Sequence, residues 1–203
     1  MPRKSRYEAP GAVHHVYARG VDRCAIFRDD QDRWAYLDLL AEVVQRWKWD
    51  CLAYCLMGNH VHLLVRTPDP TLGRGIHRLH SFYAQDFYAR HGRVGHLFQD
   101  RYGSSRVWTP GRLLRVADYI ADNPVTAGFC RHATDWPWGS AAVIAAGDAP
   151  LWIASPSRLV AVQRELNDDS YTAQLSAATL AQERDRDVAP WPARDIAALR
   201  SAA

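Results

Sequence analysis

Two apolar segments separated by a Gly-Asn pair constrain the fold of this chain most strongly. The segments DCLAYCLM (50–57) and HVHLLVR (60–66) are rich in aliphatic, aromatic and β-branched residues, which is typical of strands. Gly58 and Asn59 tolerate the backbone conformations of a two-residue hairpin turn. The sequence therefore predicts an antiparallel hairpin whose second strand begins at His60.

The second strand of this hairpin carries two histidines one residue apart. Alternate side chains of a strand point to the same face, so His60 and His62 project together while Val61 and Leu63 point into a core. Two imidazoles a few ångströms apart can share a metal ion. The pattern fits equally well two partly buried histidines that hydrogen-bond to the backbone, and the motif alone leaves both interpretations open.

The rest of the chain predicts a split βαβ fold. Strand patterns at 13–20 and 103–109 and helical patterns at 30–47, 71–92 and 110–124 give the order strand, helix, strand, strand, helix, strand, helix. Pro110 is expected to begin the last helix and Pro124 to end it. We expect an α+β, ferredoxin-like fold: an antiparallel sheet with helices on one face.

The chain changes character near residue 150. Residues 1–149 hold all of these patterns and are expected to form one domain. Residues 150–203 are rich in alanine, with weak helical patterns, and we expect a C-terminal helical or irregular extension there. The sequence assigns no role to this extension.

Targeting signals and disulfide patterns are absent from the sequence. No apolar run reaches the roughly 18 residues that span a bilayer, and no apolar segment follows the basic N-terminus. We therefore expect no membrane partner and a cytoplasmic location. The four cysteines are then expected to stay free, since the cytosol is reducing.

Positive charge is concentrated in the middle of the chain. Between Thr71 and Arg115 there are eight arginines and two acidic residues, a balance of +6, whereas the whole chain carries +3. A local excess of arginine indicates a surface that binds the phosphate backbone of a nucleic acid. A solvated helix face would instead mix its charges.

The last predicted helix adds two polar residues. Tyr119 and Asn123 are four residues apart and therefore share a face of the helix. A core tyrosine and a C-terminal asparagine are the ordinary interpretation of each residue alone. Their combination with the histidine pair and the arginine-rich segment favours a functional site.

Several motifs, in this order, resemble the HUH single-tyrosine transposases, and more narrowly the REP-associated tyrosine transposases. These motifs are HHVYARGVDRCAIFRDDQDR, GNHVHLLV, RHGRVGHLFQDRYGS, DYIADNPVTAGF and DWPWGSA, and the resemblance covers about residues 10 to 145. It implies an HUH endonuclease fold and makes residues 1–149 the catalytic domain.

The resemblance also implies a mechanism. His60, His62 and Asn123 would bind a divalent ion, Mg²⁺ or Mn²⁺, and Tyr119 would attack DNA to give a 5′-phosphotyrosine and a free 3′-OH. Imidazole ligands tend to favour softer ions than Mg²⁺, so activity with Mn²⁺ is expected. The implied substrate is single-stranded DNA with a hairpin, a repetitive extragenic palindrome, so the protein would be nucleoid-associated when bound.

A glycine- and arginine-rich segment near residues 90–106 is expected to contact this DNA. Glycines allow close approach of the backbone, arginines pair with phosphates or guanine edges, and aromatic rings stack on unpaired bases. The residues expected to bind DNA are Arg19, Arg93, His96, Phe98, Gln99, Arg101, Tyr102 and Arg106.

Two other functions remain open at this point. One is a non-catalytic, domesticated protein that binds DNA hairpins on the same fold, although an intact set of Tyr119, Asn123 and both histidines argues against such decay. The other is a metal-dependent phosphodiesterase in which water replaces Tyr119. The sequence leaves both a monomer and a homodimer open.

Overall fold

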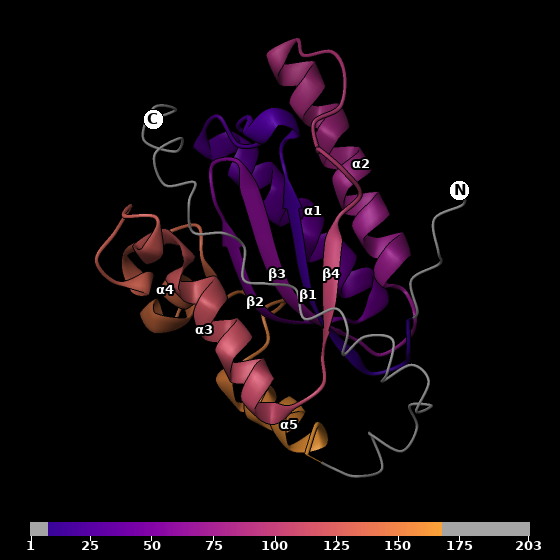
Figure 1. The fold of residues 1–203 in the computed structure, drawn as a ribbon, viewed down its shortest axis with the longest axis vertical. Helices are drawn as coiled ribbons and strands as arrows, with labels where there is room; N and C mark the ends of the chain where they lie inside the picture. The colour runs from indigo at the N-terminus through magenta and orange to yellow at the C-terminus, as the bar shows by residue number, and fades with distance from the viewer. Residues whose placement is uncertain (1–7, 168–203) are drawn as a thin grey trace.

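The computed structural model describes residues 8–167 (Figure 1). Its main elements, in chain order, are β1 (Ala12–Arg19), α1 (Asp30–Trp47), β2 (Asp50–Leu56), β3 (His60–Thr67), α2 (Leu72–His91), β4 (Gly103–Val107), α3 (Pro110–Thr126), α4 (Ser140–Ala146) and α5 (Pro156–Glu165). Two short 3₁₀ helices lie at Val21–Arg23 and Ala133–Asp135. The first seven elements follow the predicted order, so the α+β fold class is confirmed.

The strands form one antiparallel sheet in the order β2-β3-β1-β4. The predicted hairpin joins β2 to β3, and the backbone N–H of Met57 donates to the carbonyl of His60 across the turn at 2.9 Å. On its other side β3 pairs with β1, which places Tyr17 opposite His62 and Arg19 opposite His60. This pairing brings Tyr17 and Arg19 of β1 beside the two histidines.

Both faces of the sheet are covered. The side chains of Val61, Leu63 and Val65 on β3 pack with α1 and α2 in one buried core. On the other face, Leu113 and Ile120 of α3 pack against the sheet in a second core. The helices of the split βαβ unit therefore share one face as expected, and the third predicted helix lies across the opposite face (Figure 1).

Helix boundaries follow local signals, with one exception. The side chain of Asp29 caps α1 by accepting from the backbone N–H of Asp32, and Gly92 ends α2 in a left-handed conformation (φ 59°). The prediction that Pro124 ends α3 was wrong, because the helix continues to Thr126. Proline in the last turn leaves only one backbone donor missing, and the N–H of Ala127 still bonds to the carbonyl of Asn123 at 3.0 Å.

The chain after α3 returns to the outer edge of the sheet. The N–H of Leu56 in β2 donates to the carbonyl of Trp138 at 2.9 Å, and the N–H of Ala154 donates to the carbonyl of Cys51 at 2.9 Å. Side chains of this returning segment, including Trp138 and Ile153, are buried in the core beneath α1. The segment therefore covers β2, which is an edge strand.

All four cysteines are free, as expected, and Cys51 and Cys55 are buried in β2. Across residues 8–167, no helix is both long enough and apolar enough to cross a membrane.

Candidate functional site

The two histidines of β3 lie on the face of the sheet that α3 covers. Their ring centroids are 5.1 Å apart and the rings are nearly perpendicular. A small cavity of about 10 Å³ lies beside them, lined also by Tyr17, Ala18 and Arg19 of β1. The predicted shared direction of His60 and His62 is therefore observed.

The turn residue Asn59 determines that Nδ1 of His60 carries a proton. The Asn59 amide nitrogen donates to the carbonyl of Arg23 at 3.1 Å, so its Oδ1 atom is the one that faces Nδ1 of His60 at 2.7 Å. An amide oxygen only accepts, and Nδ1 of His60 must therefore carry the proton. A neutral His60 then has its lone pair on Nε2, the arrangement of a metal ligand.

Helix α3 presents Tyr119 and Asn123 to these histidines. The helical spacing places both side chains on the face that meets the sheet, and the ring of Tyr119 stands edge-on to that of His62 with centroids 5.4 Å apart. Oδ1 of Asn123 lies 3.1 Å from Nε2 of His60. The four residues proposed as catalytic from the sequence thus meet in space.

The contact between His60 and Asn123 joins two acceptors. The amide of Asn123 also hydrogen-bonds to the phenol oxygen of Tyr119, which turns its oxygen toward His60. A cation between the two acceptors, or a second proton on His60, satisfies the pair. Neighbouring ligands of an octahedral ion with bonds of about 2.1 Å lie roughly 3 Å apart, so the spacing fits a shared divalent ion.

The environment of Tyr119 keeps its phenol protonated. Burial raises the pKa of Tyr119 above its ordinary value of 10, and the nearby hydroxyl of Tyr17 adds to this shift. The hydrogen bond from Asn123 and the positive charge of Arg19 lower the pKa, but burial outweighs them. The phenol is therefore a weak nucleophile at neutral pH unless further positive charge lies near it.

The sequence interpretation missed His15 of β1, which touches the site. Nε2 of His15 lies 3.1 Å from Nδ1 of His62, and the edge of its ring packs against Tyr119 with centroids 5.9 Å apart. Burial, followed by the charges of His60 and other neighbours, holds the pKa of His62 well below 6.5, so that imidazole is neutral. The strand period could have revealed His15, because His15 and Tyr17 are two residues apart in β1 and therefore lie on the same face.

The segment expected to contact DNA passes next to this site. The backbone N–H of Gln99 donates to the carbonyl of Arg19 at 2.9 Å, and that of Val21 donates to the carbonyl of Leu97 at 3.0 Å. The segment and α2 together enclose a cleft of about 760 Å³, which is large enough for a nucleotide. His96, Gln99 and Arg101 line this cleft and are exposed.

The other residues of that segment have partners within the protein. The ring of Phe98 stacks on that of His80 with centroids 4.3 Å apart, and Nη1 of Arg93 lies 3.0 Å from Sγ of Cys24. Tyr102 is buried, although it lines the cleft. Arg106 is also buried and lies over the ring of Trp108, with His14 beside it in the sheet.

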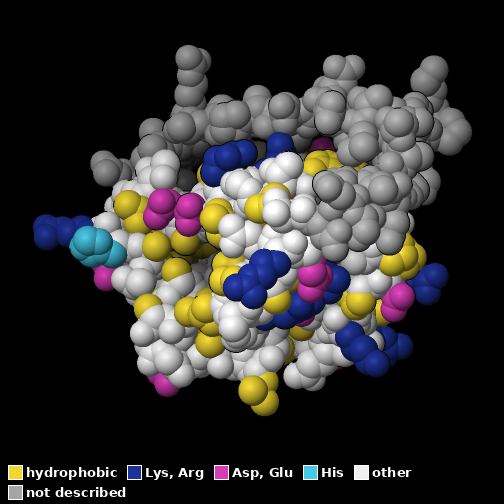
Figure 2. Space-filling view, turned by 90° about the horizontal axis from the view of Figure 1, so that it is seen from below, with side chains coloured by type: hydrophobic (Ala, Val, Ile, Leu, Met, Phe, Trp, Pro, Cys, Tyr) yellow, Lys and Arg dark blue, Asp and Glu magenta, His cyan; other side chains and the backbone are white. Residues whose placement is uncertain are grey.

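The arginine-rich middle of the chain is partly neutralised in the fold. Arg78 of α2 pairs with Glu42 of α1 at 2.6 Å, and Arg90 pairs with Asp29 at 2.8 Å. Seen from the end of the molecule where α3 begins, Lys and Arg side chains are interspersed with acidic and apolar ones (Figure 2). The charge balance of the sequence segment therefore overstates the positive surface of the folded protein.

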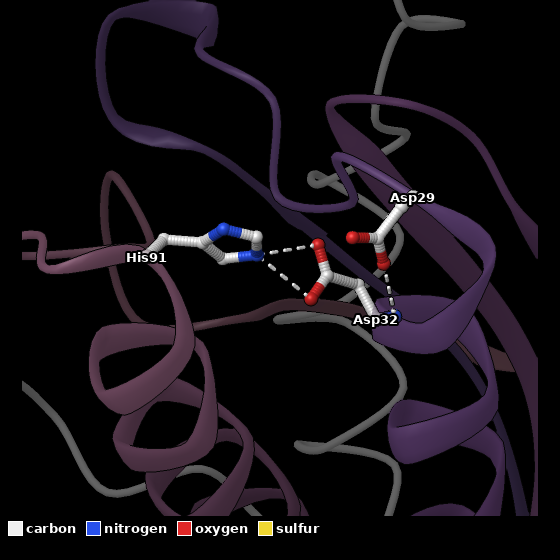
Figure 3. Close-up of side chains that lie close together, drawn as sticks. All are labelled: Asp29, Asp32 and His91. Carbon is white, nitrogen blue, oxygen red and sulfur yellow. Dashed lines mark hydrogen bonds and ion pairs between the residues drawn. The ribbon is translucent and has the colours of Figure 1, made fainter.

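A second cluster resembles a metal site in composition. Asp29 at the N-cap of α1, Asp32 of α1 and His91 of α2 lie together (Figure 3), and their ligand atoms are within 4.8 Å of one another. Arg90, however, forms ion pairs with both carboxylates, and Nε2 of His91 donates to Asp32 at 2.9 Å. With an arginine already balancing its charge, the cluster is better suited to joining α1 to α2 than to holding a cation.

Comparisons with known proteins relate the chain to one family and to a solved structure of similar fold. The family model of IS200-like transposases matches residues 11–123. A solved structure of a REP-associated tyrosine transposase bound to a REP hairpin is similar in fold, with a TM-score of 0.60 and 19% identity over 76% of this chain and 92% of that chain.

A second solved structure is a protein provisionally assigned as a transposase from Deinococcus radiodurans R1. It is 18% identical over 59% of this chain and 96% of that chain, and its TM-score of 0.41 is too low to indicate a shared fold. No curated protein sequence matches the chain significantly.

Proposed function

The chain belongs to the family of IS200-like transposases, and we propose that it is a metal-dependent single-stranded DNA endonuclease and strand transferase that cleaves beside DNA hairpins. The observation that carries the proposal is the meeting of Tyr119 and Asn123 of α3 with His60 and His62 of β3. The solved neighbour of the same fold was bound to a REP hairpin, which supports a REP-like palindrome as the substrate.

The donor set of the site fits a divalent ion. His60, His62 and Asn123 would hold Mg²⁺ or Mn²⁺, which supplies charge that polarises the scissile phosphate and stabilises the negative charge of the transition state. A histidine binds a metal through the lone pair of a neutral ring. His60 has its lone pair on Nε2, and the ring of His62 is neutral, so both can serve as ligands. Two imidazoles favour Mn²⁺ over Mg²⁺.

Tyr119 is proposed to be the nucleophile. Its phenol oxygen forms a bond to phosphorus while the bond from phosphorus to the 3′ oxygen breaks, and the phenol proton is transferred overall to the 3′ oxygen. The products are a 5′-phosphotyrosine and a free 3′-OH, and reversal with another 3′-OH would rejoin strands without a nucleotide cofactor. Asn123 orients the phenol through its amide, and the positive charge of Arg19 favours the developing phenolate.

Contacts with DNA are proposed to extend from Arg19 along residues 93–106. The backbone bonds at Gln99 hold this segment beside the cavity at the histidines, so DNA bound at the site would reach the neighbouring cleft. Within it, exposed His96, Gln99 and Arg101 are the strongest candidates for contact. Arg93, Phe98, Tyr102 and Arg106 stay predictions, and buried Arg106 has the least access to a ligand.

The domain boundary, the location and the oligomeric state concern the whole protein. We propose that residues 1–149 are the catalytic part, that the protein acts in the cytoplasm, and that it is nucleoid-associated on its DNA. Residues 168–203 lie outside the described residues, and the role of the C-terminal extension stays open to experiment. Size-exclusion chromatography with light scattering would decide between a monomer and a homodimer.

A covalent-attachment assay tests the reaction. Protein is mixed with labelled single-stranded hairpin oligonucleotides and Mn²⁺ or Mg²⁺ and separated on a denaturing gel. We expect a shifted, protease-sensitive band that is lost in Tyr119→Phe and His60→Ala, and in the wild type with EDTA. Tyr54→Phe is the matched control, since it deletes a buried hydroxyl in the core on the other face of the sheet.

The two other functions give different results in this assay. Cleavage that persists in Tyr119→Phe without an adduct would identify water as the nucleophile and make the protein a phosphodiesterase. Tight hairpin binding in a native gel, with no cleavage of any hairpin that binds, would identify a non-catalytic binding protein. Either result would overturn the proposed strand transferase.

A further inference from the structure

His15 of β1 contacts the imidazole of His62, a proposed metal ligand, although 47 residues separate them. Nε2 of His15 lies 3.1 Å from Nδ1 of His62, and the ring centroids are 5.2 Å apart with an angle of 29° between the planes. The register of β1 and β3 places His15 opposite Leu64 and Tyr17 opposite His62, so His15 is a diagonal neighbour of His62 on the same face. Regular strand pairing therefore sets the contact.

His15 is not placed as a metal ligand itself. A site made of His15, His60 and His62 would bring one ring nitrogen from each within ligand distance of a common ion. Among residues 8–167, only Asp29, Asp32 and His91 bring three such atoms within 4.8 Å of one another. His15 therefore acts on the proposed site through its contact with His62.

We propose that His15 is a positioning residue: its Nε2 accepts a hydrogen bond from Nδ1–H of His62 and thereby keeps the lone pair of His62 on Nε2 for a metal ion. This inference rests on the proposed metal-dependent function. Only one of the two facing nitrogens can carry the proton when both rings are neutral. With the proton on His62, His62 is a ligand; with the proton on His15, the lone pair of His62 faces His15 and is lost to the metal.

The geometry supports the direction of this hydrogen bond. Nε2 of His15 faces Nδ1 of His62 at 3.1 Å, a distance at which one nitrogen donates and the other accepts. His60 has the equivalent partner in Asn59, whose Oδ1 accepts from Nδ1 at 2.7 Å. Each proposed histidine ligand thus has its own acceptor on Nδ1, as metal-binding histidines usually do.

Two substitutions test separately the hydrogen-bond acceptor of His15 and the space that its ring fills. In His15→Gln the amide oxygen reaches about as far as Nε2 and still accepts, whereas His15→Phe fills the space without an acceptor. The readout is the affinity of the DNA-free protein for Mn²⁺ by isothermal titration calorimetry. We expect His15→Phe to bind roughly 10- to 100-fold more weakly and His15→Gln to stay near wild type, with His62→Ala marking loss of a ligand.

A spectroscopic readout distinguishes positioning from simple packing. Imidazole ¹⁵N NMR of the metal-free protein should show the proton of His62 on Nδ1 in the wild type and in His15→Gln, and a shift of that proton toward Nε2 in His15→Phe. His132→Phe, at an exposed histidine, should change neither readout.

The outcomes are distinct. Equal Mn²⁺ affinity in wild type and His15→Phe would overturn the role of His15 and leave the proposed function standing. No Mn²⁺ binding by the wild type would overturn the metal-dependent function itself. If His15→Phe does not fold, the wild-type spectrum decides, because a proton on Nε2 of His62 would refute the inference.

Discussion

Replacing Asp32 with alanine should weaken the junction between α1 and α2. The Asp32 side chain is 1% exposed and accepts from the backbone N–H of Arg28 at 2.8 Å and from His91 at 2.9 Å. It also forms an ion pair with Arg90 (Figure 3 shows the acidic residues and His91). Alanine removes all of these interactions and leaves the backbone N–H of Arg28 and the ring of His91 without this acceptor.

The magnitude follows from the hydrogen bonds that Asp32 accepts. Each hydrogen bond to a charged group contributes about 1.5–3 kcal/mol, so losing those from the Arg28 N–H and from His91 should cost about 3 kcal/mol. Arg90 is exposed and retains Asp29 at 2.8 Å and Gln31 at 3.0 Å, so the loss of its pair with Asp32 adds little. For a chain of this size each kcal/mol lowers Tm by about 2–4 °C, which gives a decrease of about 6–12 °C.

Thermal unfolding in EDTA, followed by circular dichroism, measures this effect. Asp30→Ala is the matched control, because Asp30 is an exposed acid in the same first turn whose pair with Arg33 should contribute at most about 1 kcal/mol. Mn²⁺ affinity should be the same in Asp32→Ala and wild type, since Arg90 already balances the cluster. Equal Tm values for the two alanine variants would refute the structural role, and loss of Mn²⁺ binding in Asp32→Ala would show that the cluster binds metal.

Two further predictions concern pH and packing. Burial lowers the pKa of His14 to about 3, so below pH 6.5 the unfolded chain takes up a proton at this residue that the folded protein does not. The contribution of His14 should therefore lower the free energy of unfolding by about 2 kcal/mol from pH 7 to pH 5. Urea denaturation at both pH values should show a smaller fall for His14→Phe, and an equal fall would contradict the assignment. A Cβ at Gly103 would lie 2.2 Å from the ring of Tyr17, so Gly103→Ala should displace that ring and slow cleavage by up to about 100-fold. Gly75→Ala, whose Cβ would lie 2.3 Å from the ring of Trp49, is far from the site and should cost about 1–3 kcal/mol of stability while folded molecules keep their cleavage rate. Similar cleavage rates for both variants would show that the position of the Tyr17 ring does not affect cleavage.

Local patterns predicted the main elements because alternation and helical periodicity depend on consecutive residues. The helix at Asp30–Trp47 has the bounds that its acidic first turn and apolar spacing indicate. The shared direction of His60 and His62, and that of Tyr119 and Asn123, follow from the periods of a strand and a helix. Pro124 was misjudged because the cost of proline depends on its place in the last turn, which the sequence does not show.

Contacts between distant elements could not be predicted in this way. The partner of His62 on β1 depends on which strands pair and in what register, and neither is encoded in a short window. The arginines of α2 similarly looked unpaired in the sequence because their partners lie far back in the chain: Glu42 of α1 pairs with Arg78, and Asp29, the N-cap of α1, pairs with Arg90. That Tyr119 faces the histidines also depends on α3 crossing the second face of the sheet.

The segment that returns to β2 has a consequence for how the protein can be shortened. An open edge strand offers unpaired backbone groups to other chains, and Asp50–Leu56 is almost entirely apolar. In the folded protein the carbonyl of Trp138 and the N–H of Ala154 occupy part of that edge. A chain cut before Trp138 would keep every residue of the proposed active site but would expose β2 as an unpaired edge strand. We therefore expect it to aggregate. Solubility and catalysis therefore depend on different stretches of this sequence.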